Sequence, residues 1–148
     1  MLFCCMIEDF MFYFSHRTLH HPWLYPYIHK IHHENQVVFV LAAIHTHPIE
    51  YIFGNILPMI AGPALLWHRI HRASVFGWYF IRACETLDAH SGYAFPWSPF
   101  RLLPFQIESD YHYYHHDSNV GNYATFFSYW DIAFGTNKAY RAQHPKSE

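Results

Sequence analysis

Fifteen of the 148 residues are histidines, and eight of them form three short clusters. The clusters read H-R-T-L-H, H-K-I-H-H and H-Y-Y-H-H, and they contain His16, His20, His29, His32, His33, His112, His115 and His116. Residues three and four apart share one face of a helix, so each cluster directs imidazoles toward one side. Neutral imidazole is a common protein ligand for iron and zinc. The spacing therefore predicts a metal site.

Other metal and nucleotide motifs are absent from the sequence. His33 and Glu34 begin an H-E-x-x-H pattern, but Val37 stands where its second histidine belongs. No glutamate has a histidine at the E-x-x-H spacing of carboxylate-bridged di-iron bundles. The three cysteines form no C-x-x-C, and no P-loop, G-x-G-x-x-G or G-x-S-x-G occurs. The sequence therefore predicts a site made wholly or almost wholly of histidine.

The composition is unusually apolar for a small enzyme. Hydrophobic residues make up 52% of the chain and charged residues 14%, while the net charge is −2. One domain of this kind fits a membrane-embedded or membrane-surface protein, and nothing in the charge indicates nucleic-acid binding.

The elements expected around the histidines are helical. Residues 1–20, 27–34 and 108–117 are predicted to form helices, and 124–134 form an aromatic, amphipathic segment. Residues 51–67 and 73–87 are two apolar stretches, the first about 25 Å long as a helix. We expect them to form a hairpin that enters the bilayer, with a buried hairpin of a soluble bundle as the alternative. The predicted fold class is all-α: a membrane-associated helical bundle with one apolar hairpin and a histidine-lined cytosolic metal site.

From about Glu8 to Tyr140 the chain resembles the fatty acid hydroxylase superfamily of membrane non-haem di-iron oxygenases. The segments that carry the resemblance are EDFMFYFSHRTLHH, LYPYIHKIHHE, HPIE, ETLDAHSGYAFPWSPFRLLPF, YHYYHHDSNVGNYATFFSYWD and FGT. Within the superfamily, D-A-H-S-G-Y, F-P-W-S and G-N-Y-A are most similar to the C-4 methylsterol oxidases.

The resemblance implies ten metal ligands. They are His16, His20, His29, His32, His33, His47, His90, His112, His115 and His116. Six neighbouring residues are candidates for supporting these ligands through hydrogen bonds. They are His21, His45, Glu85, Asp88, Asp110 and Asp117.

The resemblance also implies a reaction and its requirements. Two iron ions and O₂ would oxidise a sterol C-4 methyl group stepwise to alcohol, aldehyde and acid. Electrons would come from NAD(P)H through cytochrome b5 or its reductase. The protein would be a multi-pass protein of the endoplasmic-reticulum membrane, with the metal site facing the cytosol. The alternatives are a fatty-acyl or sphingoid hydroxylase, a sterol desaturase, or a degenerate metal-binding membrane protein.

The chain departs from the family pattern in three places. We expect residues 1–140 to form a fatty acid hydroxylase-type domain without the usual N-terminal transmembrane hairpin, and 141–148 to form a polar tail. The last cluster usually reads H-H-D-x-H-H, but Tyr111 and Tyr113 replace its leading histidine and its aspartate. Thr86 stands four residues before His90, where related hydroxylases have a histidine. His47 is the candidate for the missing imidazole.

Overall fold

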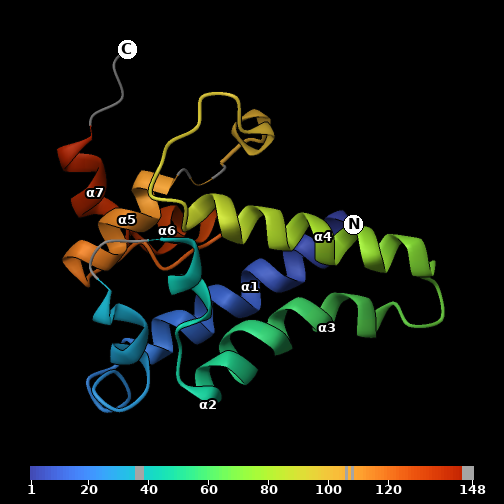
Figure 1. Ribbon diagram of the computed structural model, residues 1–148, viewed down its shortest axis with the longest axis horizontal. Helices are drawn as coiled ribbons and strands as arrows, with labels where there is room; N and C mark the ends of the chain where they lie inside the picture. The colour runs from blue at the N-terminus through green and yellow to red at the C-terminus, as the bar shows by residue number, and fades with distance from the viewer. Residues whose placement is uncertain (36–38, 106, 108, 145–148) are drawn as a thin grey trace.

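The computed structural model describes residues 1–35, 39–105, 107 and 109–144. Over this part of the chain every regular element is helical, which confirms the all-α prediction (Figure 1). In chain order the elements are α1 (Leu2–Leu19), η1 (His29–Glu34), η2 (Val40–Ile44), α2 (Pro48–Glu50), η3 (Tyr51–Ile56), α3 (Leu57–Leu65), α4 (Arg72–Ala89), η4 (Pro99–Leu102), α5 (Ser109–Ser118), α6 (Tyr129–Phe134) and α7 (Lys138–Gln143). The element η3 is a π-helix, and η1, η2 and η4 are 3-10 helices.

The long helices α1 and α4 and the η3–α3 segment form the framework of the molecule. Helix α1 packs along η3 and α3, and α4 returns past them after the turn that follows α3 (Figure 1). Gly62 permits the close approach of α1 and α3, because a Cβ atom there would lie 2.6 Å from the Cα of Cys4. The indole N–H of Trp78 on α4 donates to the carbonyl of Met59 on α3 at 2.9 Å.

The two predicted apolar stretches are successive helical segments, but their relation to a bilayer stays a prediction. Of the first stretch, residues 51–65 fold as η3 and α3, and residues 73–87 lie within α4. Pro63 lies inside α3, which is nine residues long. None of the helices in the described part of the chain combines the length and the apolar character needed to cross a membrane.

The C-terminal elements cover the end of α1 that carries the first histidine cluster. Buried Tyr13 on α1 packs there with Ile107, Tyr111 and Ala124. Only 129–134 of the aromatic segment 124–134 are helical, because the Ser128 amide donates to the carbonyl of Phe105 at 2.7 Å instead of to the carbonyl of Ala124 as a helix requires. Helix α7 reaches Gln143, so the expected polar tail begins as a helix; residues 145–148 and Glu108 lie outside the described part of the chain.

Candidate metal centre

Nine histidines converge in two groups beside the end of α1. In each group one potential ligand atom per residue lies within 4.8 Å of all the others. The first group contains His16, His20, His29, His33 and His115. The second group contains His32, His90, His112 and His116. All are buried except His20, which is half-buried.

The first group consists of imidazoles whose inner nitrogens face one another. The Nε2 atoms of His16 and His29 are 3.1 Å apart, and those of His29 and His33 are also 3.1 Å apart. His16 uses Nδ1–H to donate to the carbonyl of Tyr123 at 2.7 Å, and His29 uses Nδ1–H to donate to Glu50 Oε1 at 2.8 Å. A neutral imidazole carries one N–H, so the Nε2 atoms of both residues present lone pairs.

Facing lone pairs repel, and a shared cation removes the repulsion. Two nitrogens about 2.1 Å from one metal ion lie about 3.0 Å apart at a right angle and about 4.2 Å apart when opposite. The observed Nε2 separations of 3.1 Å for His16–His29 and 3.2 Å for His20–His115 match such neighbouring ligands. The donor set of this group therefore fits a metal ion.

The second group shows the same arrangement. His112 Nε2 lies 2.9 Å from His90 Nε2 and 3.2 Å from His116 Nε2. His90 donates Nδ1–H to the carbonyl of Thr86 at 3.0 Å, which leaves its Nε2 lone pair facing His112. Thr86 therefore supports a clustered histidine through its backbone, at the position where related hydroxylases have an imidazole.

Each H-x-x-H-H cluster divides between the two groups. His29 and His33 of η1 join the first group and His32 joins the second, whereas α5 contributes His115 to the first group and two histidines to the second. The groups adjoin, since the rings of His33 and His116 are 4.5 Å apart between centroids. Adjacent histidines point to different centres because neighbouring residues diverge by about 100° on an α-helix such as α5 and by about 120° on a 3-10 helix such as η1.

Glu50 is a supporting residue that the sequence reasoning missed. Its carboxylate is buried and accepts the Nδ1–H of His29. Carboxylates in this position orient a metal-bound imidazole and raise its basicity. The signal was present in the H-P-I-E segment, where Glu50 follows His47 by three residues.

The six candidate supporting residues and one of the ten candidate ligands do not belong to either histidine group. His47 belongs to neither group; its side chain accepts the backbone N–H of Ile49 at the start of α2. Five candidate supporting residues contact side chains other than the clustered histidines. The ring of His21 packs beside Trp23, and Glu85 forms an ion pair with Arg82. The hydrogen-bonded pairs are His45 with Glu34, Asp88 with Ser98, and Asp110 with Tyr140. Asp117 is exposed. In the described residues none of these side chains bonds to a clustered histidine.

The two tyrosines of the last cluster face different surroundings. Tyr113 is 41% exposed, so its position on α5 points away from both histidine groups. Tyr111 is buried, and its hydroxyl donates to Asp131 at 2.9 Å. The replacement of an aspartate by Tyr113 therefore lies on the side of α5 that faces away from the imidazoles.

Burial keeps the imidazoles in the form that binds metal. Desolvation lowers the pKa of His16 and of His33 to about 3, and that of His32 to about 4. Burial also lowers the pKa of His90 to about 3. These side chains are therefore neutral at physiological pH, with lone pairs available to a cation.

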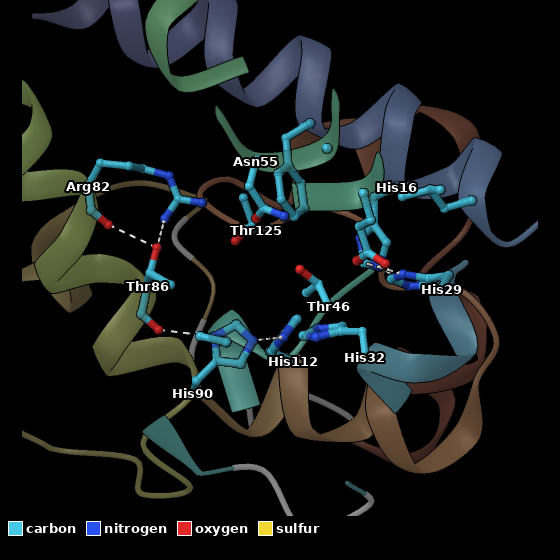
Figure 2. A pocket seen from close by; sticks show the side chains of 15 residues that line it. His16, His29, His32, Thr46, Asn55, Arg82, Thr86, His90, His112 and Thr125 are labelled. Carbon is cyan, nitrogen blue, oxygen red and sulfur yellow. Dashed lines mark hydrogen bonds and ion pairs between the residues drawn. The ribbon is translucent and has the colours of Figure 1, made fainter. Parts of the chain in front are cut away.

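A small cavity of about 30 Å³ adjoins both groups. Its volume is enough for about two water molecules. Imidazoles from both groups form part of its wall, and Figure 2 shows polar side chains on the other parts. These polar side chains are Thr46, Glu50, Asn55, Arg82, Thr86 and Thr125. A separate open cleft of about 690 Å³ reaches His20 from the surface between Phe14 and Trp23.

The fold and the site together define an all-helical protein with a two-part polyhistidine centre. Residues 1–136 match the fatty acid hydroxylase family, and the chain belongs to that family. It is 46% identical over 143 residues to very-long-chain aldehyde decarbonylase GL1-11 of Oryza sativa. It is also 43% identical over 143 residues to methylsterol monooxygenase 2-2 and 41% identical over 155 residues to methylsterol monooxygenase 2-1, both of Arabidopsis thaliana.

Each of these alignments covers 95% of this chain but only 53%, 53% and 56% of the respective relatives. The chain thus spans about half the length of the curated relatives it matches. No solved structure matches it.

Proposed function

We propose that this chain forms the catalytic centre of an iron-dependent oxygenase that oxidises the C-4 methyl group of sterol intermediates. The observation that carries the proposal is the pair of adjoining histidine groups, with rings of His33 and His116 4.5 Å apart. Such an arrangement suits two neighbouring iron ions. When bound, iron would supply the redox chemistry that activates O₂ toward a C–H bond, which zinc cannot do.

The chain's own residues would prepare the site. His16, His20, His29, His33 and His115 would hold one ion, and His32, His90, His112 and His116 the other. Glu50 keeps His29 in the tautomer with a free Nε2, and the carbonyl of Thr86 does the same for His90. The small cavity beside both groups has room for only about two water molecules.

Membrane residence is part of the proposal. The framework helices carry many exposed apolar side chains, among them Phe3 on α1, Leu65 on α3, and Phe76 and Phe80 on α4, each at least 43% exposed. Large exposed apolar surfaces mark membrane or protein contacts. We propose that this surface faces lipid in the endoplasmic-reticulum membrane, that the centre faces the cytosol, and that electrons arrive from NAD(P)H through cytochrome b5 or its reductase.

A second candidate reaction is the conversion of a very-long-chain aldehyde. The aldehyde decarbonylase relatives are as similar to this chain as the methylsterol monooxygenases are. We favour the sterol reaction because the D-A-H-S-G-Y, F-P-W-S and G-N-Y-A segments resemble that branch.

The test uses a sterol-requiring host strain that lacks its own C-4 methyl oxidase. Wild-type protein should restore growth and C-4 demethylated sterols, whereas His115→Ala should not, because His115 would be a ligand of the first ion. Membranes are assayed in parallel with a 4,4-dimethyl sterol and with a very-long-chain aldehyde, each with O₂ and NADH. Turnover of the aldehyde alone would favour the second reaction, and turnover of neither would contradict the proposal.

A further inference from the structure

The peptide group between Tyr123 and Ala124 connects a clustered histidine to a buried carboxylate. Its carbonyl oxygen accepts the Nδ1–H of His16 at 2.7 Å, and its N–H, which belongs to Ala124, donates to Asp131 Oδ2 at 2.9 Å. Both groups belong to one planar, conjugated unit. The carboxylate, the peptide and the imidazole therefore form a continuous hydrogen-bonded chain.

Burial raises the pKa of Asp131, but the hydrogen-bond donors around its carboxylate oppose this effect and favour the ionised form. Asp131 is 0% exposed, and each carboxylate oxygen accepts two hydrogen bonds. Oδ1 accepts from the Tyr123 amide at 3.0 Å and the Thr136 hydroxyl at 2.6 Å. Oδ2 accepts from the Tyr111 hydroxyl at 2.9 Å and the Ala124 amide. A carboxylate has about four acceptor sites, so all of them are used by donors.

A second peptide group, between Gly121 and Asn122, makes a similar contact with His115. The carbonyl of Gly121 accepts the Nδ1–H of His115 at 2.6 Å, and the following N–H of Asn122 donates to the carbonyl of Thr136 at 3.1 Å. Gly121 has φ +75°, and a Cβ there would lie 2.1 Å from that carbonyl oxygen. Residues 121–124 thus approach the first histidine group in a shape that requires glycine.

We propose that Asp131 is a positioning residue for the first metal site, acting on His16 through the 123–124 peptide group. This inference rests on the metal binding in the proposed function. The negative charge polarises the peptide and strengthens its carbonyl as an acceptor. The stronger acceptor keeps the proton on His16 Nδ1 and makes Nε2 more basic, as a directly bonded carboxylate does for metal-bound histidines.

The hydrogen-bonded chain from Asp131 through the 123–124 peptide group leads to the first histidine group. In the second group His90 donates to the carbonyl of Thr86 on its own helix. Over the described residues no hydrogen bond joins segment 121–124 to a histidine of the second group. Loss of the Asp131 charge should therefore affect one site and leave the other unchanged.

The test compares Asp131→Asn with Asp9→Asn in the full chain. Asp9 is also 0% exposed and accepts a backbone amide, that of Phe127 at 3.1 Å, but this contact leads to no clustered histidine in the described residues. Fe²⁺ is titrated anaerobically against a chromophoric chelator, and the melting temperature is measured alongside. We expect two binding steps in the wild type, and in Asp131→Asn a loss of about tenfold in affinity at one step only. Asp9→Asn should keep both affinities even where its melting temperature falls.

Unchanged affinities in Asp131→Asn would overturn the inference, as would an equal loss in Asp9→Asn. If the wild type binds no Fe²⁺, the proposed function fails and the inference fails with it. A measurement on the wild type covers the case in which Asp131→Asn does not fold. Addition of diamagnetic Zn²⁺ should shift the amide proton resonance of Ala124 clearly more than that of Phe127. Equal shifts would also overturn the inference.

Discussion

In the described part of the chain, Glu50 supplies the carboxylate that hydrogen-bonds directly to a clustered histidine, His29. It is buried, and burial raises its pKa to about 8. A metal ion on His29 would favour the ionised form of Glu50, because the positive charge would reach the carboxylate through the imidazole. The residue is therefore coupled to metal binding by charge as well as by geometry.

Glu50→Gln should lower the metal affinity of the first site by about tenfold or more, because the amide oxygen accepts the His29 N–H without a negative charge. The measurement is a competition titration with Fe²⁺. Glu34→Gln is the matched control, since Glu34 bonds to exposed His45 and to no clustered histidine. Equal affinity in the wild type and Glu50→Gln would contradict the assignment.

The buried imidazoles also predict how stability depends on pH. Burial lowers the pKa of His16, His33 and His90 to about 3 and that of His32 to about 4, against about 6.5 in an unfolded chain. Below pH 6.5 the nine clustered imidazoles bind protons in the unfolded chain but not in the folded chain, and they outnumber buried acids such as Asp9 and Glu50, whose raised pKa has the opposite effect. The free energy of unfolding should therefore fall steadily as the pH decreases from 6.5 toward 4.

Urea unfolding of the metal-free protein at several pH values measures this dependence. Bound metal should be released in the same range, because the loss of folded stability exposes the imidazoles to solvent, where they take up protons and no longer bind metal. Full stability and full iron content at pH 5 would contradict the prediction.

Among the secondary-structure elements, the contact between helices α1 and α3 positions the first histidine cluster. Gly62 lies against the backbone of Cys4, with no room for a side chain. Helix α1 carries His16 and ends at its C-cap His20, so a displacement of α1 would move two candidate ligands together.

Gly62→Ala should lower the free energy of unfolding by about 1–3 kcal/mol, since the new Cβ would overlap backbone atoms that cannot rotate away. Gly77→Ala is the control. Gly77 lies within α4, where an added Cβ would meet only the end of Met1 at 3.8 Å, and alanine favours a helix by up to about 1 kcal/mol. Chemical unfolding of the two variants should give shifts of opposite sign; a Gly62→Ala protein as stable as the wild type would contradict the tight contact.

On the scale of the whole molecule, the centre connects segments that are distant in sequence. Its histidines come from α1, the segment around η1, the end of α4, and α5. A metal ion that binds only the folded arrangement stabilises it by mass action. Metal content should therefore control the stability of the entire chain.

Removal of metal with a chelator should lower the melting temperature by about 5–10 °C per site. This value applies when the metal-loaded protein is measured with free metal at about 100 times the dissociation constant. Calorimetry of the metal-loaded and chelated protein measures the difference. The double variant His115→Ala/His116→Ala, which removes one imidazole from each group, should respond much less to the chelator. Identical responses of the wild type and the double variant would contradict the two-site arrangement.

Local spacing accounts for most of what could be predicted. The helical class, the elements that carry the clusters and the metal-binding character follow from i, i+3 and i, i+4 histidines. The division of His32 from His33 between two groups also has a local cause, the angle between adjacent side chains. Spacing does not identify isolated contributors: His90 joins the second group, whereas His47 is the N-cap of α2 instead.

The amino-acid sequence by itself determined which residues can bind metal and that helices present them, because residue chemistry and helical periodicity are local properties. Only the tertiary structure decided how nine imidazoles divide between two centres and which groups accept their outer N–H protons. Those acceptors are Glu50, the carbonyls of Thr86, Gly121 and Tyr123, and through a peptide group Asp131. Backbone carbonyls occur at every residue, so only the packing of distant segments selects the ones that meet a histidine.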